Sequence, residues 1–294
     1  MSWKKRALAA ALAGLCLLSG CSLPGRQQDE GPKDTVDVSD AYFGLAWYKN
    51  GTLNPVTDTD SIAPVGMPDF LDKTTKILSW MKSLEKEELK AIWKCNDKIA
   101  RQNFDRLENM DLYHMLTPAI LSYEGIAFQY MAPAVFEDGQ FEYIQKHLRI
   151  LSAFYGNLKP LDGVKPYRLE MQAKVTIGNP RNLYDYWGDM LYKSIIDDSQ
   201  IIINLASKEY SKCIEKYLSP KDTYITITFC ELSGEKLVTK GTYAKMARGE
   251  MVRFMAERGI ENPADIQKFN RLGYRFREDL SSEKEYIFER LSAL

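Results

Sequence analysis

Residues 147–171 read HLRILSAFYGNLKPLDGVKPYRLEM, and this is the most informative stretch of the chain. The apolar residues of 149–152 predict a strand that runs into a turn, and 158–162 predicts a loop. Residues 166–171 then predict a return to extended chain. Two glycines, two prolines, an arginine and a glutamate among aromatic residues indicate a shaped surface loop rather than a spacer.

The rest of the chain predicts alternating helices and strands in one α/β domain. Its 294 residues, 45% of them hydrophobic, are enough for a sizeable core. Helices are expected over 69–83, 97–107, 138–147, 182–195, 207–217 and 242–258. Two more are expected to begin after Ser83, as an N-cap, and at Asn262–Pro263. Strands are expected over 119–123, 200–205, 223–231, 236–238, 274–276 and 286–288, with 200–205 buried on both faces. We therefore predict a single mixed-sheet domain with surrounding helices.

Four further motifs follow the opening stretch in order. They are NLYDYWGD at 182–189, INLASKEY at 203–210, KGTYAKMARG at 240–249 and FNRLGY at 269–274. Together with 147–171 they make residues 59–294 resemble the YaaA family of bacterial peroxide-stress proteins. The resemblance implies a cytoplasmic protein with a helix-hairpin-helix-like region. Such a protein is expected to bind DNA weakly, through contacts to the DNA phosphate backbone, and to limit iron-driven oxidative damage. It names no catalytic residue, so enzymatic activity is left open.

The beginning of the chain predicts a different protein. Lys4–Arg6, the apolar run 7–18 and the small residues before Cys21 are typical of a bacterial lipoprotein signal over 1–21, with Cys21 as the lipidation site. The apolar run is too short to span a bilayer as a helix, which needs about 20 residues. A buried N-terminal helix is the alternative. A genuine signal would make the chain a membrane-anchored lipoprotein.

Residues 22–58 are interpreted as a tether and a foreign N-terminal segment. The tether is polar, and 41–55 resembles the mature start of a solute-binding lipoprotein. The YaaA family normally opens with an apolar strand leading into a Ser-Pro-Ala-Lys segment, which is lacking before Ser61. We interpret the chain as a lipoprotein-like N-terminal segment joined near 56–60 to an unrelated YaaA-like body, whether naturally or by misassembly. If the family's opening strand belongs to the sheet, the apolar residues 42–48 offer a substitute.

Composition excludes some classes of function. The formal net charge is −1 and the pI about 6.2, so no bulk positive charge indicates nucleic acid binding. Cys95, Cys213 and Cys230 are widely spaced, which predicts reduced thiols rather than disulfides. His114 and His147 are far apart and indicate no metal site. Without a Walker or G-x-G-x-x-G loop, no cofactor is expected.

Polar residues of the motifs lie at the predicted ends of helices and strands. We expect Arg168, Asp189, Ser207 and Arg248 to converge on one cleft, since such ends gather at one edge of an open sheet. The full candidate set for anion binding and cleft lining is Tyr155, Arg168, Glu170, Asp189, Asn204, Ser207, Lys240, Lys245, Arg248 and Arg253. Arginine and lysine there favour a nucleic acid backbone or, alternatively, a phosphorylated or nucleotide substrate of an enzyme. Equally, Arg168 is expected to lock loops by pairing with Glu170 or Asp189.

The helices predicted over 69–107 carry the candidate DNA contacts Lys94, Lys98 and Arg101. Helix-hairpin-helix modules usually bend at glycines, and none lies between Leu89 and Leu107. Asn96 is expected at the bend because asparagine tolerates a positive φ. The alternative is an ordinary helical bundle packed on Trp93.

Overall fold

The computed structural model describes residues 62–123, 125–234 and 236–291, which all lie in one compact unit. The predictions for the signal at 1–21, the lipidation site Cys21 and the segment 22–58 fall outside the described residues. Within the described ranges, no helix has both the length and the apolar character needed to cross a membrane.

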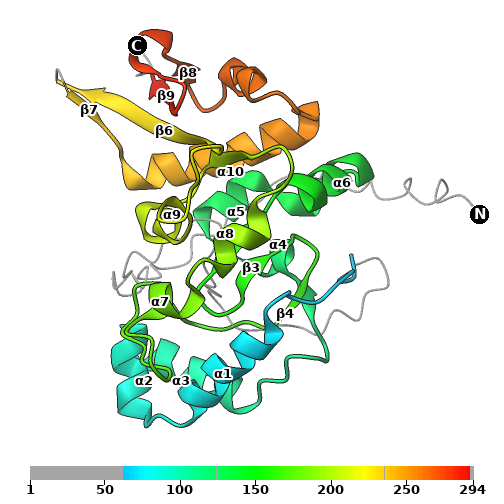
Figure 1. The fold of residues 1–294 in the computed structure, drawn as a ribbon, viewed down its shortest axis with the longest axis vertical. Helices are drawn as coiled ribbons and strands as arrows, with labels where there is room; N and C mark the ends of the chain where they lie inside the picture. Colours follow the sequence, from blue (N-terminus) through cyan, green and yellow to red (C-terminus); the bar gives the residue numbers. More distant parts are fainter. Residues whose placement is uncertain (1–61, 124, 235, 292–294) are drawn as a thin grey trace, which may run out of the picture. The chain divides into compact units, whose positions relative to one another are not determined.

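A five-stranded mixed sheet organises the C-terminal half of the described residues (Figure 1). Its strands run in the order β5, β6, β9, β8, with β7 paired to β6. The bounds are Ile201–Asn204 for β5, Thr223–Ser233 for β6, Lys236–Val238 for β7, Tyr274–Phe276 for β8 and Glu285–Arg290 for β9. The β5–β6 and β6–β9 pairs are parallel, and the β6–β7 and β8–β9 pairs are antiparallel. This confirms the predicted mixed sheet and its hairpin.

Strand β6 shows why the sheet has helices on both faces. Ile225, Ile227 and Phe229 are buried on the face that packs against α10 (Gly241–Arg258). On the other face, the Tyr224 hydroxyl donates a hydrogen bond to Glu215 of α9 (Lys208–Glu215) at 3.3 Å. The strict alternation of β6 therefore marks one buried apolar face and one partly exposed, more polar face. Helix α10 ends as predicted at Gly259, whose φ of 55° suits glycine.

Strand β5 lies at the edge of this sheet among the described residues, which corrects the expectation that 200–205 is buried on both faces. Its burial falls from Asn204 towards Ile201, which is 39% exposed. The run of isoleucines predicted a central strand, because a sequence shows the hydrophobicity of a strand but not how many neighbours it has.

The N-terminal helices α1 (Leu71–Lys82), α2 (Lys86–Trp93) and α3 (Asp97–Glu108) confirm three predictions. The predicted cap was wrong: Glu85, not Ser83, begins α2, through a reciprocal capping box with Glu88. Ser83 instead ends α1, where its hydroxyl donates to the Trp80 carbonyl at 2.7 Å.

Short elements connect these helices to the sheet. They are β1 (Thr117–Pro118), α4 (Ala119–Ser122), α5 (Ile126–Met131), η2 (Pro133–Val135), α6 (Asp138–His147), β2 (Ile150–Ser152), β3 (Gly156–Leu158), β4 (Gly163–Val164), α7 (Leu183–Trp187) and α8 (Met190–Ile195). Two short 3-10 helices, η3 (Pro263–Lys268) and η4 (Glu278–Leu280), flank β8.

Three expectations in this middle region are corrected. Residues 119–122 form the helix α4 and not a strand, and the Ser122 hydroxyl bonds back to the Pro118 carbonyl at 2.9 Å. The helix expected over 182–195 is divided at Gly188, whose φ is 54°. The stretch 150–164 is largely buried rather than a surface loop, because β2 and β3 form an antiparallel pair inside the core.

Helix α10 approaches α5 closely at one glycine. A Cβ built on Gly249 would lie 1.8 Å from the carbonyl oxygen of Ala127, a distance that only a shift of the backbone relieves. The two helices therefore pack with glycine as a necessary spacer.

Gly249→Ala is expected to lower the free energy of unfolding by about 1–3 kcal/mol or more, as overpacking does elsewhere. The control is Gly139→Ala in α6, where an added Cβ meets nothing within 4 Å. That control should be neutral or stabilising, since alanine favours helix. Urea unfolding of both variants makes the comparison, and an equal effect at the two sites would contradict the close packing.

Candidate functional site

Arg168 is buried and holds the motif loop against the helical region. Only 3% of it is exposed. Its Nε–H donates to the Trp93 carbonyl at 3.0 Å, and its Nη2 lies 4.0 Å from Glu170 Oε1. Burial lowers the pKa of Arg168, but arginine stays charged in proteins. These contacts tie the motif loop to the end of α2, and the predicted role of Arg168 in anion binding stays a prediction.

Trp93 is the last residue of α2, so Arg168 acts at the bend between α2 and α3. Trp93 is itself 3% exposed and packs against Phe104 of α3 with ring centroids 5.2 Å apart. The bend is formed by Lys94, whose φ is 45°. The expectation that Asn96 takes the positive φ was wrong: its φ is −72°, and its side chain caps α3 by accepting from the Ile99 amide at 3.0 Å.

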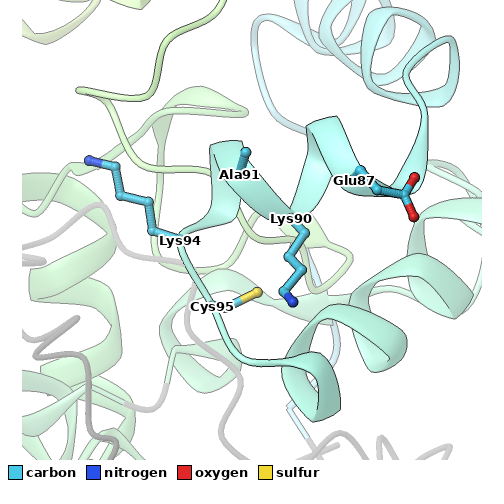
Figure 2. A pocket seen from close by; sticks show the side chains of 5 residues that line it. All are labelled: Glu87, Lys90, Ala91, Lys94 and Cys95. Atoms are coloured by element: carbon cyan, nitrogen blue, oxygen red, sulfur yellow. The ribbon is translucent and has the colours of Figure 1, made fainter.

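The outer surface of the bend carries the cations predicted to contact DNA. Lys94, Lys98 and Arg101 are all exposed. A hollow of about 530 Å³ at the end of α2 is lined by Lys90, Lys94 and Cys95, among others. Figure 2 shows the side chains of Lys90 and Cys95 directed to the same side, while that of Lys94 extends away from them. The packing on Trp93 and the exposed cations therefore coexist on the same two helices.

Acidic side chains reduce the charge of this surface. Lys90 pairs with Asp97 in the first turn of α3. A second hollow, of about 460 Å³, is lined by both of these residues together with Lys86, Arg101 and Phe104. The surface is thus basic only in part, and any anion held there is held by few charges.

Cys95 lies beside Arg168, but the structure does not make it a reactive thiol. Burial raises the pKa of Cys95, although the neighbouring cations Arg168 and Lys90 act in the opposite direction. Burial also raises the pKa of Cys213, to about 12, and that of Cys230. All three cysteines are free, as predicted. Peroxide reacts with thiolates, so these protonated thiols fit packing better than sensing.

The candidate cations near the sheet are in ion pairs or are at least partly buried. Lys240 and Arg290 both pair with Glu231, and Arg253 pairs with Glu257 at 2.7 Å. Lys245 is 2% exposed, and Arg248 is partly buried. Burial raises the pKa of Tyr274 to about 12, against the effect of the nearby cations, which include Arg248.

The remaining candidate residues have mainly structural contacts. The Tyr155 hydroxyl accepts from the Lys165 amide at 2.9 Å, and Asn204 donates to Thr226 at 3.3 Å. Asp189 pairs with Lys193 one helical turn later, at 2.5 Å. Ser207 occupies the predicted N-cap position of α9, without a capping bond from its side chain. Convergence of Arg168, Asp189, Ser207 and Arg248 on one cleft stays a prediction.

Sequence reasoning missed a buried cluster of hydroxyl groups under the motif loop. Ser152 and Tyr167 share a hydrogen bond of 2.6 Å, and the Ser152 hydroxyl also accepts from the Tyr155 amide at 2.9 Å. Burial raises the pKa of Tyr167 to about 12, so its proton stays in place at neutral pH. Tyr155 and Tyr167 both lie within 147–171, but their positions in the sequence do not indicate that both bond to Ser152.

These features define a mixed α/β protein whose motif loop supports a partly basic helical bend. A family model described as "Peroxide stress protein YaaA" matches residues 51–280. A UPF0246 protein of Agathobacter rectalis is 75% identical over 235 residues, or 80% of this chain and 94% of the relative. UPF0246 proteins of Lachnoclostridium phytofermentans and Pediococcus pentosaceus are 53% and 49% identical, over 79% of this chain and 91% and 92% of their own lengths.

The chain belongs to the YaaA family of peroxide stress proteins, as the motifs predicted. The family match begins at residue 51, a few residues before the boundary expected from the sequence.

Arg168→Met is expected to lower the free energy of unfolding by about 2–3 kcal/mol, because it removes a charged donor and leaves the Trp93 carbonyl unsatisfied. The control is Arg181→Met, at an exposed arginine, which should change stability by about 0.5 kcal/mol or less. Urea unfolding measures both. Equal losses, or none in Arg168→Met, would show that Arg168 does not hold the bend.

Proposed function

We propose that this chain binds the phosphate backbone of DNA at the bend between α2 and α3, and that it limits iron-driven oxidative damage to that DNA. Binding is weak and independent of base sequence. Lys94, Lys98 and Arg101 supply the contacts. The observation that carries the proposal is that all three cations are exposed around the start of one helix.

The geometry of α3 supports this assignment. The helix has 12 residues, and the first amides of a helix point towards its N-terminal end, where the helix dipole favours an anion. Lys94 precedes that end, and Lys98 lies in its first turn. The Asn96 side chain already accepts from the Ile99 amide, so a phosphate there would meet the remaining N–H groups of the first turn and the ammonium groups of Lys94 and Lys98. Backbone-binding modules grip DNA in this way without reading bases.

The charge balance supports weak binding. The chain carries a formal net charge of −1, and Asp97 lies among the candidate cations. Three phosphate contacts release few counterions, so the affinity is low and falls with salt. Arg168 and Lys245 are buried and are not part of this surface.

A second function is an enzyme that acts on a phosphorylated or nucleotide substrate. The burial of two cations, Arg168 and Lys245, favours it, because buried charges are costly and gather at functional sites. The burial of both side chains also places them away from a substrate at the surface. We therefore rank this function below DNA binding.

Exchanging Lys94, Lys98 and Arg101 together for Gln should weaken binding to a short random duplex. The slope of log K against log salt should become shallower by about 0.9 for each phosphate that the variant no longer neutralises. Fluorescence anisotropy at several salt concentrations measures both. In a plasmid-nicking assay with ferrous iron and peroxide, the wild type should protect the plasmid and the triple variant should not.

The matched control exchanges Lys208, Lys221 and Lys236 for Gln, which removes the same charge from exposed positions on the sheet region. An equal loss in both triple variants would mean that net charge, and not the bend, decides binding. Absence of binding at low salt, together with a saturable stabilisation by a nucleoside phosphate, would favour the enzyme.

A further inference from the structure

A groove follows the outer edge of β5. Its volume is about 420 Å³, and it is lined by every residue from Ile201 to Ala206. Six consecutive residues include side chains from both faces of a strand and the main chain between them. A groove beside an edge strand suits an extended peptide that pairs with the strand edge.

Helices enclose this groove on both faces of the sheet. Ser211 and Ile214 of α9 line it on the face of Tyr224, and Val252 and Met255 of α10 line it on the other face. The occupant must therefore be apolar on both of its own faces, as a strand between two helical layers is. Charged side chains also line part of the groove: they are Lys146, His147, Arg149, Asp197 and Glu261, and His147 pairs with Glu261 at 3.3 Å.

We propose that residues 41–48 of this same chain occupy the groove and pair with β5. Their sequence, AYFGLAWY, holds eight residues without a charge between Asp40 and Lys49. Alternate residues place Phe43, Leu45 and Trp47 on one face and Tyr42, Ala46 and Tyr48 on the other, so both faces are apolar. That is the pattern the two helical layers require.

The chain is long enough to reach. The Val65 amide donates to the Leu161 carbonyl at 3.0 Å, and the Leu161 amide donates to Gln145 at 3.0 Å. Gln145 precedes Lys146, which lines the groove, so these two bonds connect Val65 to the neighbourhood of a lining residue. The 17 residue-to-residue steps from Tyr48 to Val65 span up to about 58 Å, which is several times the length of a strand the size of β5.

Hydrogen exchange of the full-length chain, read by mass spectrometry, tests this pairing. In the wild type, amides of 41–48 should exchange at least about tenfold more slowly than those of an unstructured peptide. Ala46→Pro removes a ladder donor and should release both 41–48 and β5. Thr52→Pro, outside the segment, is the matched control and should leave both protected. Protection of α10 should be the same in all three proteins.

A second variant covers the case in which Ala46→Pro unfolds the protein. Phe43→Ser keeps the main chain able to pair and should weaken protection of 41–48 and β5 without affecting α10. Unprotected 41–48 in the wild type, or unchanged β5 protection in Ala46→Pro, would overturn the proposal. Protection that disappears on dilution, with a dimer seen by light scattering, would mean that a second copy supplies the segment and would overturn pairing within one chain.

Discussion

The buried guanidinium of Arg168 joins the two parts of the structure on which the functional assignment depends. It belongs to the motif stretch 147–171, and it bonds to the main-chain carbonyl that ends α2. A carbonyl at a helix end has no partner within the helix, so Arg168 satisfies it and fixes where the bend begins. The Glu170 carboxylate lies 4.0 Å from the same guanidinium, so part of the charge of Arg168 is balanced inside the protein.

This arrangement separates the residues that hold the fold from those that face solvent. Arg168, Tyr155 and Ser152 form the interior of the motif loop. Lys94, Lys98 and Arg101 remain outside it, on the two helices that the loop supports. A long sequence motif can thus mark residues that hold the fold together, while the exposed lysines and arginines of the candidate site lie outside that motif.

Much of the fold was predictable where local chemistry decides it. The alternation of β6, the glycine that ends α10 and the Asn262 cap of η3 all follow from neighbouring residues alone. Residues 119–123 and β5 were not predictable, because short apolar runs fit a helix, an edge strand or a central strand equally well. The candidate site shows the same limit. Arginine at 168 predicts a partner with negative charge, but only the structure shows that the Trp93 carbonyl, 75 residues away, is one of its partners.

The central claim is that the bend between α2 and α3 is the surface that meets DNA. An amide-resolved NMR titration of the isotope-labelled protein with a short duplex tests it most directly. The account predicts that the shifts concentrate on the amides of Lys94, Asp97, Lys98 and Arg101 and diminish with added salt. Shifts that concentrate on α10 or on the loop around Arg168, with the bend unchanged, would contradict it.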